Sequence, residues 1–230
     1  NMFQTDGVSN FLSKMFGPEL SFAKKMTSDG VKIAIIKYSF GGTALYPGAG
    51  YGGSCFPKDV KALSKIAQEN DYEARLINAV ELVNDDQKLV ICNKIIKRFG
   101  GNLKGFTFGV WGLAFKPGTD DMREAPSIYV IKELVKRGAK IKAYDPKAIN
   151  EAKSHYLKGV KNTKFIDSKY DVLKNSDALI LLTEWKEFRS PNFNQIKSLL
   201  KRPLIFDGRN LFNSFGLDTL GIEYHQIGKI

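Results

Sequence analysis

The sequence predicts an α/β protein: a doubly wound parallel-sheet domain at the C-terminal end, preceded by a helical segment and a glycine-rich loop. Two observations predict it. Short apolar strands alternate with helices from residue 101 onward, which is typical of a parallel sheet covered on both faces. Loop 45–55 holds four glycines and a proline, too many for regular structure. We expect an unassigned leader at 1–43, the loop and a helical linker at 44–100, and a Rossmann-like domain at 101–230.

The first hundred residues contain two strong helix signals. In the leader, 10–16 fits a helix ended by Gly17-Pro18, and 31–36 fits a short strand or a buried helical turn equally well. After the loop, 57–70 predicts a helix with Pro57 in its first position. A longer helix is predicted at 73–99, ended by Gly100-Gly101. Six apolar residues of this longer helix fall near one face: Leu76, Val80, Val83, Val90, Ile91 and Ile95.

The region after residue 101 alternates between the two element types. Its predicted strands are 106–115, 140–144, 164–166, 178–182 and 204–206, and its predicted helices are 126–137, 147–157, 170–175 and 194–200. Such alternation with short connections is typical of right-handed strand–helix–strand units.

Composition narrows the class of protein. Lys and Arg total 35 against 24 acidic residues, a net charge of +11. Because the lysines are spread along the whole chain, a solvated basic surface explains this charge better than a nucleic-acid site, and we expect no nucleic-acid partner. No run of eighteen apolar residues exists, so we expect no membrane span. The first residues lack a signal-peptide pattern, which favours the cytoplasm.

The two cysteines differ in their surroundings. Two cysteines are too few for a disulfide framework, and with two scattered histidines they predict no metal site. Cys92 lies among apolar residues on the long helix and favours core packing. Cys55 follows the glycines and precedes a helix, whose N-terminus stabilises a thiolate, and Lys58 adds a positive charge. From the residues alone, Cys55 fits a nucleophile and a buried structural cysteine equally well. For Asp59, the position in the first turn favours a structural role at the helix terminus over the orientation of a water molecule.

A second candidate site follows the strand at 106–115. In an open parallel sheet, ligands bind beyond the carboxyl ends of the strands. Lys116 and Arg123 lie in that position, and Arg209 follows a later strand; such cations suit a diphosphate. The alternative is that acidic residues of the same loop pair with Lys116 and Arg123 and neutralise their charges. For Arg209, the alternative is a turn residue without a ligand. The candidate neutralising acids are Asp120, Asp121 and Glu124.

Three motifs resemble one known family. Residues 47–59 (PGAGYGGSCFPKD), 112–127 (GLAFKPGTDDMREAPS) and 207–210 (DGRN) are similar, in the same order, to the active-site loop and the UDP-binding domain of the UDP-glucose 6-dehydrogenases. These belong to the UDP-glucose/GDP-mannose dehydrogenase family. The resemblance runs from about residue 44 to the C-terminus.

The resemblance implies NAD-dependent oxidation of UDP-glucose to UDP-glucuronate, in two hydride transfers, for polysaccharide biosynthesis. Cys55 would attack the sugar aldehyde to give a thiohemiacetal and then a thioester, and Asp59 would place the water or stabilise the intermediates. Lys58 and Arg123 match positions that contact NAD. The positions that match substrate contacts are Ala44, Leu45, Tyr46, Pro47, Gly48, Gly52, Phe115, Lys116 and Arg209.

The chain also departs from the family. No glycine-rich dinucleotide turn stands upstream of Cys55, and 1–43 does not reproduce the central helix that carries a catalytic lysine and asparagine. We therefore expect a fragment without the NAD domain, with little or no activity by itself, because hydride transfer needs close positioning. The alternatives are an inactive nucleotide-sugar-binding module and a dehydrogenase for GDP-mannose or a UDP-N-acetylsugar. Family members usually form homodimers through the central helix. Because that helix is not recognised in 1–43, the association state of this chain stays open, with a homodimer as one possibility.

Overall fold

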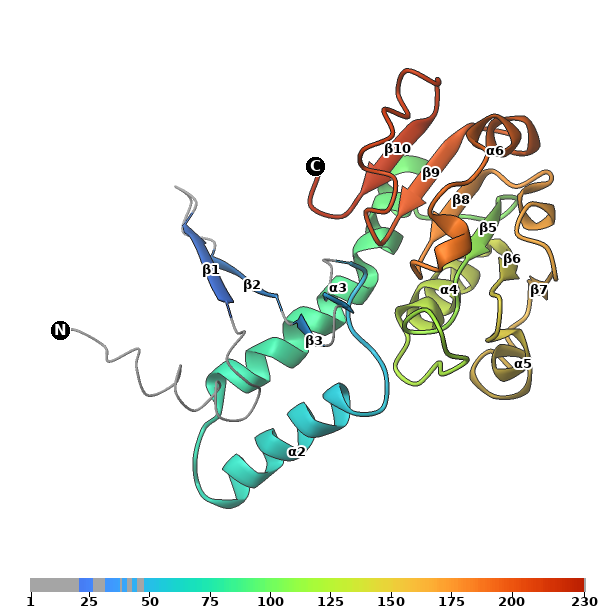
Figure 1. Ribbon diagram of the computed structural model, residues 1–230. Helices are drawn as coiled ribbons and strands as arrows, with labels where there is room; N and C mark the ends of the chain where they lie inside the picture. Colours follow the sequence, from blue (N-terminus) through green and yellow to red (C-terminus); the bar gives the residue numbers. More distant parts are fainter. Residues whose placement is uncertain (1–20, 27–31, 38, 41–42, 45–47, 230) are drawn as a thin grey trace. The chain divides into compact units, whose positions relative to one another are not determined.

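The computed structural model of the protein describes residues 21–26, 32–37, 39–40, 43–44 and 48–229 (Figure 1). The chain divides into two compact units, 1–47 and 48–230. Each unit is described by itself.

The first unit contains two short antiparallel pairs. Strand β1 (Ser21–Met26) pairs with β2 (Lys32–Lys37), and β3 (Ser39–Phe40) pairs with β4 (Thr43–Ala44). The strand alternative at 31–36 is therefore correct from Lys32 onward, whereas β1 has no counterpart in the sequence-based prediction. The predicted helix at 10–16 lies outside the described residues.

The second unit is built on a six-stranded sheet whose strands are all parallel. The strands are β5 (Thr107–Trp111), β6 (Lys140–Tyr144), β7 (Thr163–Phe165), β8 (Ala178–Leu181), β9 (Leu204–Asp207) and β10 (Glu223–Gln226). Their order is β10-β9-β8-β5-β6-β7 (Figure 1). This is the order of a doubly wound nucleotide-binding sheet, with the chain reversing direction between β5 and β8. The predicted fold class is confirmed, and the reversal point marks the edge where such sheets bind ligands.

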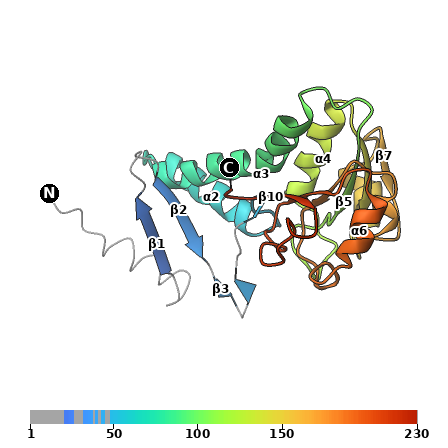
Figure 2. The ribbon, with the colours of Figure 1, turned by 90° about the horizontal axis from the view of Figure 1, so that it is seen from above.

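Helices cover both faces of this sheet. Helix α4 (Pro126–Lys136) and the C-terminal half of α3 (Arg75–Phe99) pack together on one face, and α6 (Phe193–Leu199) lies on the other (Figure 2). The 3₁₀ turn η2 (Asp171–Leu173) also contacts β5 and β6. Strand β8 is buried along its whole length, as expected for a central parallel strand.

Three predicted elements are shorter or different in the structure. The strand predicted at 106–115 ends at Trp111, because Gly112 has a φ of +94°, and a Cβ atom at Gly112 would stand 2.5 Å from Thr183 Cβ. The helix predicted at 147–157 is a short α5 (Ile149–Glu151) that continues as the π-helix η1 (Ala152–Tyr156). The helix predicted at 170–175 is only the 3₁₀ turn η2. A further 3₁₀ turn, η3, covers Lys186–Phe188.

Two helices connect the glycine loop to the sheet. Helix α2 (Phe56–Glu69) begins one residue before Pro57 and runs beside α3 as a helical hairpin (Figure 1). The apolar face predicted for α3 is wrong in its N-terminal half. Ile91 and Ile95 are fully buried, whereas Leu76 and Val83 are 67% and 66% exposed. Within the described residues, no helix combines the length and the apolar character needed to cross a membrane.

Candidate functional site

The start of the glycine loop lies against the loop that follows β9. The backbone of Gly48 approaches the Arg209 guanidinium so closely that a Cβ atom at Gly48 would stand 2.5 Å from Nη1. Ala49 is fully buried, and its Cβ would lie 3.2 Å from a Cβ placed on Gly208. Only residues with little or no side chain fit this contact. The loop therefore reaches the carboxyl edge of the sheet at β9.

The second half of the loop lies against the segment that follows β5. Gly53 donates its N–H to the Arg123 carbonyl oxygen at 2.7 Å. A Cβ at Gly52 would stand 2.4 Å from the Glu124 carbonyl oxygen, and one at Gly53 would stand 2.8 Å from the Phe115 ring. The glycine loop, the loop after β5 and the loop after β9 thus meet at one edge, as the sequence predicted for Lys116, Arg123 and Arg209.

The two cysteines occupy opposite environments. Cys92 is fully buried, its Sγ lies 3.7 Å from the Val130 carbonyl oxygen, and burial raises its pKa to about 12; its predicted core packing is confirmed. Cys55 is exposed and is the N-cap residue of α2. Its Sγ lies 3.7 Å from the Ser54 hydroxyl oxygen. The buried structural alternative for Cys55 is therefore wrong, and its thiol is open to a ligand.

The first turn of α2 carries the two charged residues that the resemblance singled out. Asp59 donates its N–H to the Cys55 carbonyl oxygen at 2.8 Å. Both Lys58 and Asp59 are exposed. Asp59 thus begins the hydrogen-bonded part of the helix, as the structural interpretation predicted, and its carboxylate stays on the same turn as the thiol.

Arg123 forms an ion pair on its own loop. Its guanidinium holds the Asp121 carboxylate by two contacts, at 2.7 and 3.0 Å, in a fork geometry. Hydrogen bonding to Asp121 raises the pKa of Arg123, and the nearby Cys55 contributes to the same effect. The alternative of an ion-paired loop is therefore correct for Arg123 and Asp121. Lys116 is exposed, and its Nζ lies 5.3 Å from the centre of the Phe115 ring.

Arg209 has a partner that the sequence did not reveal. Glu184, just after β8, lies 2.6 Å from Nε and 2.8 Å from Nη2 of Arg209. The two side chains are 14% and 11% exposed, so the pair is largely removed from water. The only sequence signal for Glu184 was its position after an apolar strand, at the same sheet edge as Arg209.

Two buried carboxylates shape the loops of this edge. Asp145 accepts hydrogen bonds from the backbone N–H groups of Leu113 and Ala114 and from the Trp185 indole, at 2.7 to 3.1 Å. Asp207 accepts from the Arg209 N–H and the Tyr224 hydroxyl, both at 2.8 Å, and burial raises its pKa. Such satisfied carboxylates fix loops that carry no regular hydrogen-bond ladder.

The remaining predicted substrate residues precede the described part of the loop. Ala44 ends β4 in the first unit, and Leu45, Tyr46 and Pro47 lie outside the described residues. Their predicted contacts stay predictions.

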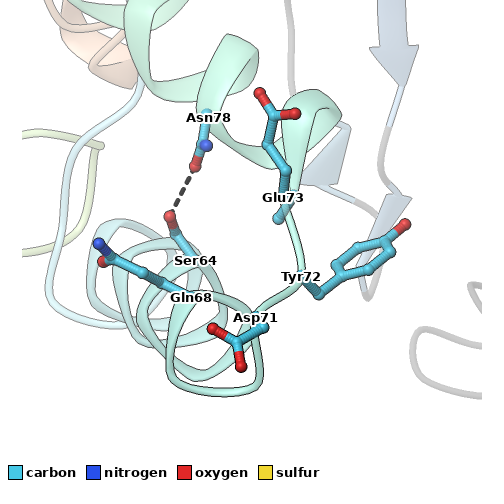
Figure 3. Close-up of a pocket in the computed structure, with 7 residues that line it drawn as sticks. Ser64, Gln68, Asp71, Tyr72, Glu73 and Asn78 are labelled. Carbon is cyan, nitrogen blue, oxygen red and sulfur yellow. Dashed lines mark hydrogen bonds between the residues drawn. The ribbon is translucent and has the colours of Figure 1, made fainter.

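A polar pocket of about 450 Å³ lies at the turn between α2 and α3 (Figure 3). Its wall includes Ser64, whose hydroxyl donates to the Asn78 side-chain oxygen at 2.6 Å. The other lining residues are Gln68, Asp71, Tyr72, Glu73 and Ala74. The turn lies at the opposite end of α2 from Cys55, about 20 Å away by helix rise. The pocket therefore does not belong to the site at the sheet edge.

Two domains of one known family match this chain. The UDP-binding domain of the UDP-glucose/GDP-mannose dehydrogenase family matches residues 109–214, and the central domain of the same family matches residues 23–86. The second match begins inside the segment 1–43, which the residues alone left unassigned. The fold and the two matched domains define a nucleotide-sugar dehydrogenase architecture. The chain belongs to the UDP-glucose/GDP-mannose dehydrogenase family.

Curated relatives and solved structures agree with this assignment. UDP-glucose 6-dehydrogenases of Pseudomonas aeruginosa and Rhizobium meliloti are 42% and 40% identical over 80% and 82% of this chain. The chain spans 41% and 42% of the length of those two relatives. A UDP-glucose dehydrogenase from Pyrobaculum islandicum superposes with a TM-score of 0.66 at 29% identity, covering 77% of this chain and 38% of that one. An NDP-N-acetyl-D-galactosaminuronic acid dehydrogenase from Methanosarcina mazei superposes with a TM-score of 0.69 at 27% sequence identity. The superposition covers 80% of this chain and 40% of that one.

Proposed function

We propose that this chain provides the nucleotide-sugar-binding edge and the nucleophile for oxidation of UDP-glucose to UDP-glucuronate, with NAD as hydride acceptor. One observation carries the proposal. The glycine loop brings an exposed cysteine to the carboxyl edge of a doubly wound sheet, where Lys116 is exposed and Arg209 is paired with Glu184. The UDP-glucose 6-dehydrogenases among the relatives support UDP-glucose as the sugar nucleotide.

In this proposal the edge binds the substrate from its two ends. The exposed Lys116 attracts the diphosphate, and Arg209, which is already paired with Glu184, adds guanidinium donors, since both groups donate charge-assisted hydrogen bonds to phosphate oxygens. Gly48 and Gly52 let the loop backbone pack against Arg209 and the Glu124 carbonyl oxygen, which keeps the loop close to the edge where the sugar would bind. The sugar carbon that is oxidised then faces Cys55.

The chemistry of Cys55 follows from a thiolate that can both add and leave. The sulfur adds to the aldehyde carbon to give a thiohemiacetal. Loss of a hydride from that carbon and of a proton from its hydroxyl group converts the thiohemiacetal into a thioester. A water molecule attacks the thioester carbonyl, the carbon–sulfur bond breaks, and the carboxylate and the thiolate are released. Asp59, on the same helical turn, orients that water. When bound, NAD supplies the hydride acceptor for both oxidations.

The described residues do not by themselves form a dinucleotide site. Lys58 and Arg123 are exposed side chains, and Asp121 already holds the Arg123 guanidinium. This arrangement favours a second candidate function, a nucleotide-sugar-binding module without its own redox chemistry. Isothermal titration with UDP-glucose and with NAD distinguishes the two, because the module binds only the sugar nucleotide.

The decisive experiment measures NADH formation and UDP-glucose binding for the protein and its Cys55→Ala variant. We expect both proteins to bind UDP-glucose and only the parent to form a covalent adduct with the 6-aldehyde of UDP-glucose, detected by mass spectrometry of the intact protein under native conditions, because a thiohemiacetal is reversible. An adduct in Cys55→Ala, or no UDP-glucose binding by either protein, contradicts the proposal.

A further inference from the structure

One face in the middle of α3 is polar although it is turned inward. Asn84 and Lys88 are only 7% and 3% exposed, and Gln87 is half-buried. Spacings of three and four residues place the three side chains on the same side of the helix. Burying an amide and an ammonium group costs free energy unless each finds a partner. Apart from Asp85 of the same helix, 3.3 Å from Lys88 Nζ, their partners lie in the glycine loop or in the segment that supports it.

Asn84 holds both backbone groups of one loop residue. Its Oδ1 accepts the Tyr51 N–H at 2.8 Å, and its Nδ2 donates to the Tyr51 carbonyl oxygen at 3.3 Å. Gln87 donates from Nε2 to the Gly48 carbonyl oxygen at 2.5 Å. The two amide side chains therefore replace the hydrogen bonds that a strand or helix would give the loop backbone.

Lys88 connects the helix to the loop after β5. Its Nζ lies 3.2 Å from Glu124 Oε2 and 4.2 Å from the centre of the Tyr129 ring. The Tyr129 hydroxyl donates to the same Glu124 oxygen at 2.5 Å, and together with Lys88 it lowers the pKa of Glu124. A Cβ at Gly50 would stand 3.0 Å from Lys88 Cγ, so the loop packs directly on the lysine stem.

We propose that Asn84, Gln87 and Lys88, hereafter the α3 clamp, are positioning residues that hold the glycine loop in the conformation that presents Cys55 to a nucleotide sugar. Segment 48–55 contains four glycines, so its free backbone samples many conformations, and orientation of reacting groups is a large part of catalysis. The clamp acts through the loop backbone and not on the ligand. The inference deepens the proposed function and rests on it only for the identity of the ligand.

The test compares the protein with Asn84→Ala, Asn84→Asp and Gln87→Ala, and with Asp86→Ala as a control. Asp86 is an exposed residue of the same helical turn. Asn84→Asp keeps an acceptor for the Tyr51 N–H, replaces the donor by a second acceptor and adds a negative charge. Hydrogen exchange of the peptide covering 48–56 is measured without ligand, UDP-glucose affinity by calorimetry, and thermal stability by circular dichroism.

We expect Asn84→Ala to speed amide exchange in 48–56 and to weaken UDP-glucose binding about tenfold, with Asn84→Asp and Gln87→Ala in between. Asp86→Ala should change neither quantity, and exchange in β5 and β8 should stay unchanged in every folded variant. If Asn84→Ala fails to fold, Gln87→Ala carries the test, because Gln87 is half-buried and its loss costs less.

Two outcomes overturn the inference. Unchanged exchange in 48–56 means that the clamp does not hold the loop, and faster exchange with unchanged affinity means that the loop conformation does not matter for the ligand. If the parent protein binds no UDP-glucose, the proposed function fails, while the exchange measurement without ligand still decides whether the α3 clamp holds the loop.

Discussion

The two halves of α3 both carry aliphatic residues but have different surroundings. In the C-terminal half, Ile91 and Ile95 are fully buried against the sheet domain. In the N-terminal half, Leu82 and Val83 are 68% and 66% exposed in the described structure. Apolar periodicity therefore predicts that a segment is helical, but a neighbouring element decides whether its apolar face is buried. The transition between the halves is the α3 clamp, where polar residues meet the glycine loop.

The sharpest test of this comparison replaces one aliphatic residue in each half. Ile95→Ala should lower the free energy of unfolding by about 2–5 kcal/mol, because it leaves a cavity in a packed core. Leu82→Ala should change it by less than about 0.5 kcal/mol, because the side chain is exposed. Urea denaturation followed by circular dichroism measures both. Equal losses for the two variants would show that the N-terminal half is also buried in solution.

A substitution in the glycine loop asks whether the close contacts of the loop are required. Gly52→Ala places a methyl group 2.4 Å from the Glu124 carbonyl oxygen and should cost about 1–3 kcal/mol through displaced backbone. UDP-glucose affinity should fall at least about tenfold, because the loop moves away from the sheet edge. Gly101→Ala is the matched control, since its nearest neighbouring atom would lie 3.8 Å away. Normal UDP-glucose binding by Gly52→Ala would show that the loop tolerates displacement.

A third test compares the buried Arg209–Glu184 ion pair with an exposed ion pair on α2. Glu184→Gln keeps the shape of the side chain but leaves Arg209 without a counter-charge, and should destabilise the fold by about 1–3 kcal/mol. Glu69→Gln removes an exposed i,i+4 pair with Lys65 and should cost less than about 0.5 kcal/mol. Thermal unfolding of both variants tests the difference. A Glu184→Gln protein as stable as its parent would mean that the pair contributes no net stability.

The smallest expected effect concerns acid stability at the far end of α3. Hydrogen bonding to Arg98, followed by that to His225, lowers the pKa of Glu223 to about 2 from the 4.5 of an unperturbed glutamate. Because the pKa is lowered in the folded state, the stabilisation is complete above about pH 4.5 and is lost as the pH falls toward 2. The side chain of Glu223 is 41% exposed, so solvent and salt weaken the effect. Urea midpoints measured from pH 5 to 2.5 should fall less steeply for Glu223→Gln, and parallel profiles would contradict this.

The fold was predictable where apolar runs are clearly bounded. Strand β6 matches its predicted limits because an alternating run ends at Asp145-Pro146, and α4 lies between Pro126 and Gly138 as those residues indicate. Strand β10 was missed because the sequence of Glu223–Gln226 is polar, as edge strands often are. The strand at 106–115 was predicted too long because the apolar residues Leu113 and Ala114 are held by the Asp145 carboxylate and not by a neighbouring strand.

The candidate site was predictable only in part, for a related reason. Lys116, Arg123 and Arg209 could be placed at one sheet edge, because the carboxyl ends of parallel strands meet there, whereas Cys55 was connected to that edge only through the family resemblance. Glu184 and the α3 clamp could not be found in this way. Their roles depend on contacts between segments 25 to 39 residues apart in the chain, and a lone polar residue carries no signal for such a partner.

The six-stranded sheet has two open edges, and the edge strands explain why it does not grow further. Strand β7 has only three residues, with Lys164 at its centre, and β10 carries Glu223 and His225. Short strands with charged side chains discourage backbone pairing with another polypeptide. The half-exposed Glu223 side chain, with Arg98 beside it, therefore makes the outermost strand a poor template for pairing with another polypeptide.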